Sequence, residues 1–396
     1  MPRAEAVLAG AVRTPIGAFM GALSGVPATE LGALVVRESL TRAGVAPEDV
    51  DDVLLGCILQ AGLGQGPARQ AAMAAGLPDS VPATTINMLC GSGLRAVAEA
   101  AQAVRAGDAG VVVAGGMESM SRAPFVADGV RGGTRLGHTA LKDTLLSDGL
   151  WCAMTDQHMG STAEILAKRF ELSREEQDAF AAESQRRAAA AMEEGRFDRE
   201  ITPVSVPQRR GDPLTVDRDE HPRPGTTVEA LAKLKPAFAK DGSVTAGNAS
   251  GINDGAAAMV VTSPERADEL GVEPMARVLG YAWTGVAPEL MGLGPIEAVP
   301  PALARAGLAV GDIELWEVNE AFAAQALLFQ RELGIPSDLL NVNGGAIALG
   351  HPVGASGARV LVTLLHAMED RGARLGVAAL CVGGGMGIAM IVESLS

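Results

Sequence analysis

One cysteine stands where a thiolate could form. Cys90 follows a strand-like apolar segment, 81–86, and precedes an alanine-rich segment, 94–105, whose composition and spacing predict a helix. Free N–H groups and the positive end of the helix dipole at such a turn favour an anion. The sequence therefore predicts that Cys90 is a nucleophile ionised near neutral pH. The alternative is a small buried apolar residue.

Three further turns carry groups suited to acid–base chemistry. His351 lies among glycines just before a predicted helix, and Cys381 and Asn319 each follow a strand-like apolar segment. Active sites of open α/β sheets form at the carboxyl ends of strands. These residues and Cys90 therefore predict one site with two thiols, an imidazole and an amide.

Composition limits what the chain can bind. Its 396 residues predict two or three domains, and a hydrophobic content of 48% with only 3% aromatic residues predicts a core of Ala, Val and Leu. The net charge of -15 argues against nucleic acid and anionic membrane surfaces as partners. No apolar run reaches membrane-spanning length and no signal-peptide layout is present, so we expect a cytoplasmic protein.

The four cysteines form neither a zinc pattern nor a disulfide framework, because they are far apart in the sequence. Cys57 lies in an apolar run and is expected in the core. Cys152 has no motif around it.

The chain contains an internal duplication. Leu40–Ala46 is echoed by Leu303–Ala309 at an offset of 263, and Ser92–Arg95 by Ser356–Arg359 at an offset of 264. Each copy then runs through a helical stretch into a strand that ends in Gly-Gly-Met. This register makes the turn of Cys90 equivalent to the turn that holds His351.

Alternating strands and helices in each copy predict a layered α/β fold of two mainly parallel halves, stacked so that the two turns meet. Residues between the copies differ in character: they are rich in proline and charge and contain an amphipathic helix, 174–194, with Ser173 and Glu176 as a capping box. We expect three domains: 1–120 with 251–270, an inserted loop domain at 121–250, and 271–396.

The four turns resemble a known family. Those of Cys90-Gly91-Ser92-Gly93, Asn319-Glu320-Ala321-Phe322, Gly350-His351-Pro352 and Cys381-Val382-Gly383 are similar to the signature segments of thiolases. The resemblance covers the full chain. Within the family, the Cys-Gly-Ser-Gly turn, His158-Met159-Gly160 and Met291-Gly292 resemble the biosynthetic branch, which makes acetoacetyl-CoA from two acetyl-CoA and releases CoA.

The resemblance implies a homotetramer, a coenzyme A thioester substrate, no metal or organic redox cofactor, and a role for each turn. His351 would deprotonate Cys90, which would take the acyl group, and Cys381 would remove the C2 proton of a second acetyl-CoA. His351 and a water on Asn319 would hold the enolate oxygen, and the N–H groups of Cys90 and Gly383 would hold the tetrahedral oxyanion.

The resemblance also implies a set of coenzyme A contacts: Leu150, His158, Met159, Arg223, Phe238, Ala246, Ser250, Met291, Ala321 and Phe322. Segment 203–240 holds seven Lys or Arg against five Asp or Glu, so it is locally basic in an acidic chain. Segment 151–157 departs from the usual sequence of the family, so the resemblance does not define the residues at the mouth of the acyl pocket. Segment 121–142 is also basic and is expected to contact a sister subunit.

Other functions stay open at this stage. A degradative or 3-oxoadipyl-type thiolase would share these motifs and differ in acyl chain length. An inactive lipid-binding protein of the same fold would not need four intact turns. A Cys–His hydrolase would release free acid and would leave Cys381 without a role.

Overall fold

The computed structural model describes residues 4–395, and its centre is a sheet of ten strands. These strands are β1 (Val7–Arg13), β2 (Gly17–Ala18), β3 (Asp52–Gly56), β4 (Ala83–Ile86), β5 (Val111–Ser119), β12 (Asn253–Thr262), β13 (Ala276–Gly285), β14 (Leu315–Val318), β15 (Leu375–Val382) and β16 (Met386–Ser394). Across the described residues their order is β14-β15-β16-β13-β1-β12-β5-β3-β4, with β2 beside β12.

Helices cover both faces of this sheet. They are α1 (Ala28–Ala43), α2 (Pro67–Ala75), α3 (Ser92–Ala106), α8 (Gly294–Ala306), α9 (Ala323–Leu333) and α11 (Val353–Arg371). The same halves also contain two short helices, α7 (Pro264–Leu270) and α10 (Ala346–Leu349). Among residues 4–395, none of the helices combines the length and the apolarity that crossing a membrane requires.

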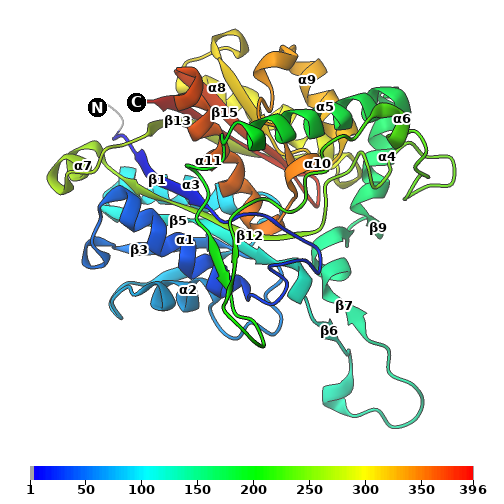
Figure 1. Ribbon diagram of the computed structural model, residues 1–396, viewed down its shortest axis with the longest axis horizontal. Helices are drawn as coiled ribbons and strands as arrows, with labels where there is room; N and C mark the ends of the chain where they lie inside the picture. Colours follow the sequence, from blue (N-terminus) through cyan, green and yellow to red (C-terminus); the bar gives the residue numbers. More distant parts are fainter. Residues whose placement is uncertain (1–3, 396) are drawn as a thin grey trace.

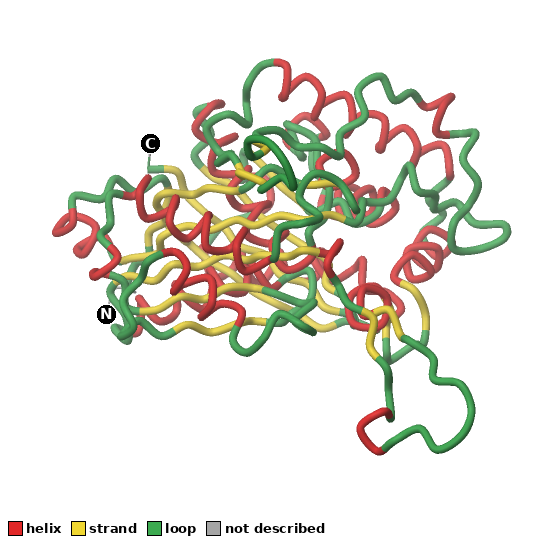
Figure 2. Tube along the Cα trace, turned by 60° about the horizontal axis from the view of Figure 1, so that its bottom comes forward, coloured by secondary structure: helices red, strands yellow, loops and turns green. Residues whose placement is uncertain are grey.

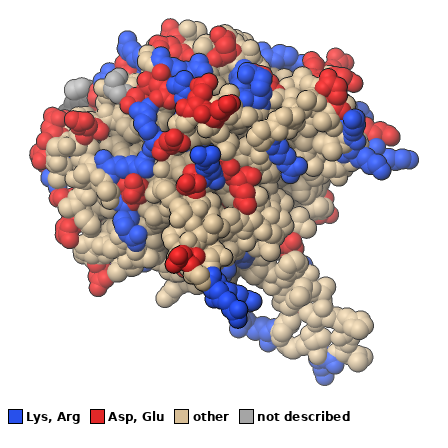
Figure 3. Space-filling view, viewed as in Figure 1, with Lys and Arg blue, Asp and Glu red and all other residues tan. Residues whose placement is uncertain are grey.

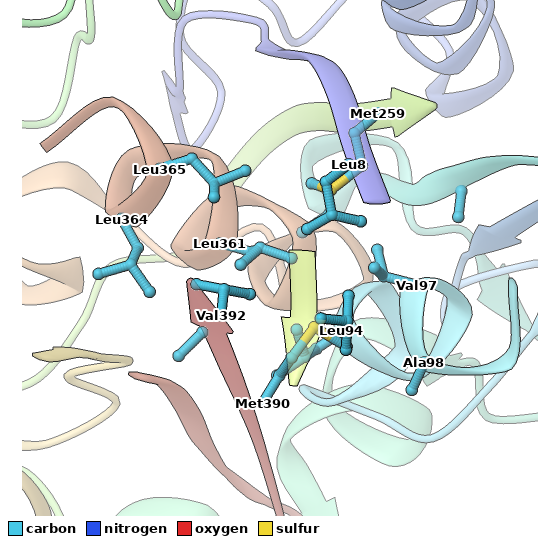
Figure 4. Close-up of a cluster of buried hydrophobic side chains, with 14 of the residues drawn as sticks. Leu8, Leu94, Val97, Ala98, Met259, Leu361, Leu364, Leu365, Met390 and Val392 are labelled. Carbon is cyan, nitrogen blue, oxygen red and sulfur yellow. The ribbon is translucent and has the colours of Figure 1, made fainter. Parts of the chain in front are cut away.

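The two halves of the sheet enclose α3 and α11 (Figures 1 and 2). Leu94 and Val97 of α3 pack with Leu361 and Leu365 of α11 in one buried cluster that also receives strand residues from both halves (Figure 4). A second cluster lies under α1 and α2, and a third lies under α8 and α9. The layers are therefore helix, sheet, helix pair, sheet, helix, and the predicted layered α/β fold is confirmed.

Strand direction is mixed within this sheet. The strand–helix units give parallel pairs, β3 with β4 and β5, and β14 with β15. The strands that return at the end of each half, β12 and β16, pair antiparallel with their neighbours. In the described part of the chain, β1 and β13 join the halves through two residue pairs, Val7 with Arg277 and Leu8 with Ala276.

The predicted duplication is visible in the order of elements. Helix α1 corresponds to α8, β3 to β14, α3 to α11, β5 to β15 and β12 to β16. The copies differ at one strand, because the second-half counterpart of β4 is reduced to a single parallel bridge between Trp316 and Leu340. Strand β12 rejoins the first half, as the sequence predicted.

The segment between β5 and β12 contains short strands and helices outside the sheet. These are β6 (Phe125–Val126), β7 (Lys142–Asp143), β8 (Trp151–Cys152), β9 (Gln157–His158), α4 (Met159–Arg169), α5 (Arg174–Glu193), β10 (Val204–Val206), β11 (Leu214–Val216) and α6 (Val228–Leu231). The capping box of Ser173 and Glu176 at the start of α5 is confirmed. Strands β6 and β7 begin an arm that projects from the body (Figure 1).

A buried ion cluster attaches this segment to β1. The guanidinium of Arg13 donates to Glu200 at 2.6 Å and to Asp219 at 2.7 and 2.8 Å, and all three side chains are buried. Removing one partner of such a cluster leaves an uncompensated buried charge, which is strongly destabilising. The cluster therefore fixes two loops of the segment onto the first half.

The closest approach of the halves depends on two equivalent glycines. A Cβ on Gly93 of α3 would lie 2.6 Å from the backbone nitrogen of Ala358, and a Cβ on Gly357 of α11 would overlap the backbone of Leu94. Each glycine therefore lets one helix touch the backbone of the other. The repeat offset of 264 relates these two positions, so the contact is pseudo-symmetric.

We expect Gly93→Ala to destabilise the fold by about 1–3 kcal/mol, because the added methyl forces α3 and α11 apart in a packed layer. Thermal unfolding followed by circular dichroism measures this loss. Gly311→Ala is the control, since a Cβ there meets no atom within 4 Å. Equal melting temperatures for the two variants would contradict the close contact.

Candidate active site

The turn of Cys90 is held by a serine that follows it. Strand β4 ends at Ile86, Leu89 adopts a positive φ of 48°, and Cys90 comes just before α3. The Ser92 hydroxyl accepts the Met88 N–H at 2.8 Å and donates to the Leu89 carbonyl at 2.7 Å. These two bonds close the turn and hold Cys90 at the start of the helix.

An equivalent serine holds the imidazole in the second half. The Ser356 hydroxyl donates to the Pro352 carbonyl at 2.8 Å, so its oxygen is free to accept from His351 Nδ1 at 2.5 Å. This pairing puts the proton on Nδ1 and leaves the Nε2 lone pair available as a base. The repeat relates Ser92 to Ser356, and the serine therefore has the same supporting place in both turns.

The His351 backbone is held from the first half. Asn253 at the start of β12 accepts the His351 N–H at 2.9 Å and donates to the Gly17 carbonyl at 2.9 Å. Gly350 is left-handed, with φ of 107°, and a Cβ there would strike Asn253. The backbone of His351 is therefore positioned by both halves.

The amide and the second thiol lie at the ends of β14 and β15. Asn319 Nδ2 is 3.4 Å from His351 Nε2, and Cys381 is buried near the end of β15. Backbone N–H groups of Gly383 and of Cys90 itself reach the Cys90 sulfur and oppose the rise of its pKa. Val353, two residues beyond His351, belongs to the apolar cluster that Cys90 contacts. The four predicted turns therefore converge.

Electrostatics differ from the sequence prediction. Burial raises the pKa of Cys90 to about 11, and burial lowers the pKa of His351 to about 3, with help from the charge on Arg359. Burial also raises the pKa of Cys381, and the neighbouring Cys90 adds to this.

The expectation that Cys90 is ionised near neutral pH is therefore wrong for the resting protein. Helix termini stabilise a charge by about 0.3–1 kcal/mol at exposed positions, which is less than the 1.36 kcal/mol that corresponds to one pKa unit. Burial in an apolar pocket is the larger effect here. The resting site holds neutral thiols and a neutral imidazole.

Most of the expected coenzyme A contacts lie near the two thiols. Leu150 packs in the cluster of Cys90, while Met159, Phe238, Met291, Ala321 and Phe322 share an apolar cluster with Cys381. His158 stacks on Phe238 with ring centroids 4.8 Å apart, and Ser250 donates its N–H to the Ala321 carbonyl at 3.0 Å. Ala246 and Arg223 are exposed and lie outside both clusters.

The unusual segment 151–157 forms a hairpin over the second thiol. Trp151 pairs with His158 across β8 and β9, and the Trp151 indole donates to Asp156 at 2.9 Å. Cys152, for which the sequence offered no role, is buried in the cluster of Cys381. Cys57 is buried in the core, as predicted.

Sequence reasoning missed the residues that support the four turns. Ser356, Asn253 and Glu118 hold backbone and imidazole groups of the His351 turn. The repeat register already aligned Ser356 with Ser92, and that signal was sufficient to find both serines. Asn253 and Glu118 carry no such signal, because their partners are backbone groups at least 59 residues away.

Comparison with known proteins agrees with this geometry. Residues 6–265 match the thiolase N-terminal domain and residues 272–394 match the thiolase C-terminal domain, so the chain belongs to the thiolase family. Thiolases are acyltransferases, and the resemblance of the four turns is confirmed at the level of the family.

Particular relatives extend over nearly the whole chain. Proteins named acetyl-CoA acetyltransferase from Chromobacterium violaceum and Pseudomonas aeruginosa are each 58% identical, covering 98% of this chain and 99% and 98% of their own lengths. The crystal structure of the Bacillus anthracis acetyl-CoA acetyltransferase has a TM-score of 0.97 at 46% identity and covers 99% of both chains.

We expect Ser356→Ala to lower kcat by about 10–10², because His351 loses the acceptor that fixes its tautomer. The measurement is the steady-state rate of acetoacetyl-CoA cleavage by CoA, with nitrogen NMR of the imidazole reporting the tautomer. Ser24→Ala, which removes a hydroxyl near the first helix, is the control. An unchanged kcat with an unchanged tautomer would contradict this role for Ser356.

Proposed function

We propose that the chain is an acetyl-CoA C-acetyltransferase, which condenses two acetyl-CoA to acetoacetyl-CoA and CoA in a reversible reaction. The observation that carries the proposal is the contact between the turns of the two cysteines: a Cβ on Gly91 would lie 2.9 Å from the Val382 side chain, and a Cβ on Gly383 would lie 3.0 Å from the Leu89 side chain. Two thiols at one site suit an acyl transfer in two steps. The names of the full-length relatives support the acetyl group as substrate.

In the first step His351 Nε2 takes the Cys90 proton while the sulfur attacks the acetyl-CoA carbonyl. The bond from the carbonyl to CoA sulfur breaks, and CoA leaves with the proton from His351. One thioester replaces another, so this step is close to energy-neutral. Backbone N–H groups of Cys90 and Gly383 are the proposed oxyanion donors, and losing one such donor typically costs about 10²–10³ in rate.

In the second step His351 takes the proton of Cys381, and the resulting Cys381 thiolate removes a C2 proton from a second acetyl-CoA. The carbanion attacks the acetyl group on Cys90, a C–C bond forms, and the Cys90 sulfur leaves with the proton that His351 holds. Burial raises the pKa of Cys381, and a thiolate of higher pKa is a stronger base toward a weakly acidic C–H. His351 and a water on Asn319 are the proposed donors to the enolate oxygen.

Coenzyme A needs both an apolar channel and cationic groups. The cluster around Met159, Phe238 and Phe322 offers apolar surface for the pantetheine arm. Segment 203–240 offers the charge, and Arg223 is exposed there. Asp219 of this segment is buried against Arg13, so the exposed part is more basic than the sequence count suggests.

A degradative or 3-oxoadipyl-type thiolase is the second candidate, because its chemistry needs the same four turns. One relative, from Staphylococcus epidermidis, carries the broader name "Probable acetyl-CoA acyltransferase" at 53% identity. Comparison of kcat/KM for acetoacetyl-CoA and longer 3-oxoacyl-CoA substrates separates the two. Preference for the longer substrates would favour the second candidate.

Substitution of Cys90 and substitution of Cys381 are expected to abolish different steps of the reaction. Cys90→Ala should abolish acyl exchange between acetyl-CoA and labelled CoA, together with condensation. Cys381→Ser should keep acyl exchange and lose condensation by orders of magnitude, since a serine hydroxyl has far too high a pKa to replace a thiolate base.

Mass spectrometry of the peptide that contains Cys90 supplies the direct readout. An acetyl group on this peptide after incubation with acetyl-CoA is expected for wild type and for Cys381→Ser. Acetylation of Cys57 or Cys152 instead, or condensation by Cys381→Ser at the wild-type rate, would refute the mechanism.

We also propose a cytoplasmic homotetramer in which the inserted domain at 121–250 supplies subunit contacts and coenzyme A contacts. The arm between β6 and β7 projects from the body, carries blue Lys and Arg patches in Figure 3, and exposes Phe125, Leu136 and Leu141. An acidic sister subunit would complement this charge.

Light scattering at physiological salt is expected to give the mass of four chains. Deleting the tip of the arm, residues 127–140, should lower that mass while leaving the sheet intact, because no strand of the sheet includes these residues. A monomeric mass for the full chain would refute the assembly.

A further inference from the structure

A buried carboxylate connects the two halves behind the site. Glu118, at the end of β5, is 1% exposed. Its carboxylate accepts three backbone N–H groups, from Ile58 at 3.0 Å, from Leu59 at 3.2 Å and from Gly354 at 2.9 Å. The first two donors belong to the loop after β3 in the first half, and the third belongs to the first turn of α11 in the second half.

The space around this carboxylate leaves little freedom. A Cβ on Gly354 would lie 2.6 Å from Glu118 Oε2, so only glycine lets the helix approach the carboxylate this closely. A Cβ on Gly56 would lie 2.6 Å from the Gly354 carbonyl, so the peptide of Gly354 is held on both sides. All three N–H donors lie in buried residues, and they would be left without partners if the carboxylate were removed.

Both anchored segments lead to reacting groups. Gly354 is three residues after His351, and the intervening Val353 packs in the apolar cluster that Cys90 contacts. Ile58 and Leu59 belong to the same cluster. The carboxylate therefore connects the wall beside the Cys90 thiol to the helix that begins directly after the imidazole.

We propose that Glu118 is a positioning residue of the acyl transfer: by binding the 58–59 loop and the first turn of α11 together, it sets His351 against Cys90. This inference rests on the proposed acetyltransferase function. A shift of about 1 Å between two reacting groups can cost about 10²-fold in rate, so such an anchor acts on kcat without touching the substrate.

The charge of Glu118 adds a separate signature. Burial raises the pKa of Glu118 to about 7, opposed by its three N–H donors and assisted by Asp254. The Cys57 thiol lies 3.9 Å from Oε1. Above neutral pH the carboxylate is ionised, and its negative charge adds to the burial that raises the pKa of Cys90.

Two substitutions of Glu118 separate the effect of its side-chain length from the effect of its negative charge. Glu118→Gln removes the charge and one acceptor, because its NH₂ group cannot accept an N–H. Glu118→Asp keeps the charge but is one carbon shorter and cannot span all three donors. We expect both variants to lower kcat for acyl exchange and for thiolysis together, by about 10–10², with KM for acetyl-CoA and CoA within about threefold of wild type.

Alkylation of Cys90 by iodoacetamide across pH, followed by mass spectrometry of its peptide, provides a readout that needs no substrate. Loss of the negative charge should shift the alkylation midpoint of Cys90 to lower pH in Glu118→Gln. The midpoint should stay in place in Glu118→Asp. The Gln variant would then have a more readily ionised thiol and a slower reaction, which loss of stability alone does not produce.

Glu200→Gln is the matched control, because it also removes a buried carboxylate, from the Arg13 cluster, and should lower the melting temperature without the same loss of kcat. A kcat for Glu118→Gln that is within twofold of wild type, or no lower than that of Glu200→Gln, would overturn the proposal, as would an unmoved Cys90 midpoint. Absence of acyl exchange in wild type would instead refute the acetyltransferase function, while the alkylation arm would still test Glu118.

Discussion

The contact between α3 and α11 is the constraint on which the rest of the molecule depends. Gly93 and Gly357 allow each helix to reach the backbone of the other, and the residues that follow them fill the central apolar cluster. Both helices begin directly after a functional turn. Packing the two N-terminal ends together therefore brings Cys90 and His351 to one place, although 261 residues separate them in the sequence. A larger residue at either glycine would separate the turns as well as the helices.

The two copies of the repeat share one backbone arrangement, but they carry different side chains at equivalent positions. Ser92 and Ser356 keep the same supporting position, one under a thiol turn and the other under an imidazole. The following arginines have separated in role: Arg95 lies 3.5 Å over the Trp283 ring and pairs with Glu99 on the surface, whereas Arg359 is buried against Glu317 and lowers the pKa of His351. One half thus presents the proposed nucleophile, Cys90, and the other presents the proposed base, His351.

Local patterns predicted the parts of this structure that repeat. Strand β14, helix α3 and the capping box at Ser173 lie where composition and spacing placed them, because these features depend on neighbours in the chain. The sequence did not predict that β12 and β16 pair antiparallel with their neighbours, since strand direction depends on which strand a segment joins. Glu118 was also missed, because its three partners are backbone groups and leave no side-chain signal in the sequence.

Burial explains why the ionisation state of Cys90 could not be predicted from the sequence of its turn. The helix N-terminus was visible in the sequence, but the apolar walls around Cys90 come from Leu150, Ile58 and Val353, which lie on separate segments. Burial among those walls raises the pKa of Cys90, and burial of the imidazole, with the charge of Arg359, lowers the pKa of His351, so the resting pair is neutral. Oxidation and alkylation follow thiolate content, and a neutral resting thiol is therefore protected from both. Under the proposed mechanism, charge develops only when a bound acyl group can receive it, next to the N–H groups of Cys90 and Gly383, so the same burial that opposes a free thiolate would confine reactivity to the loaded site.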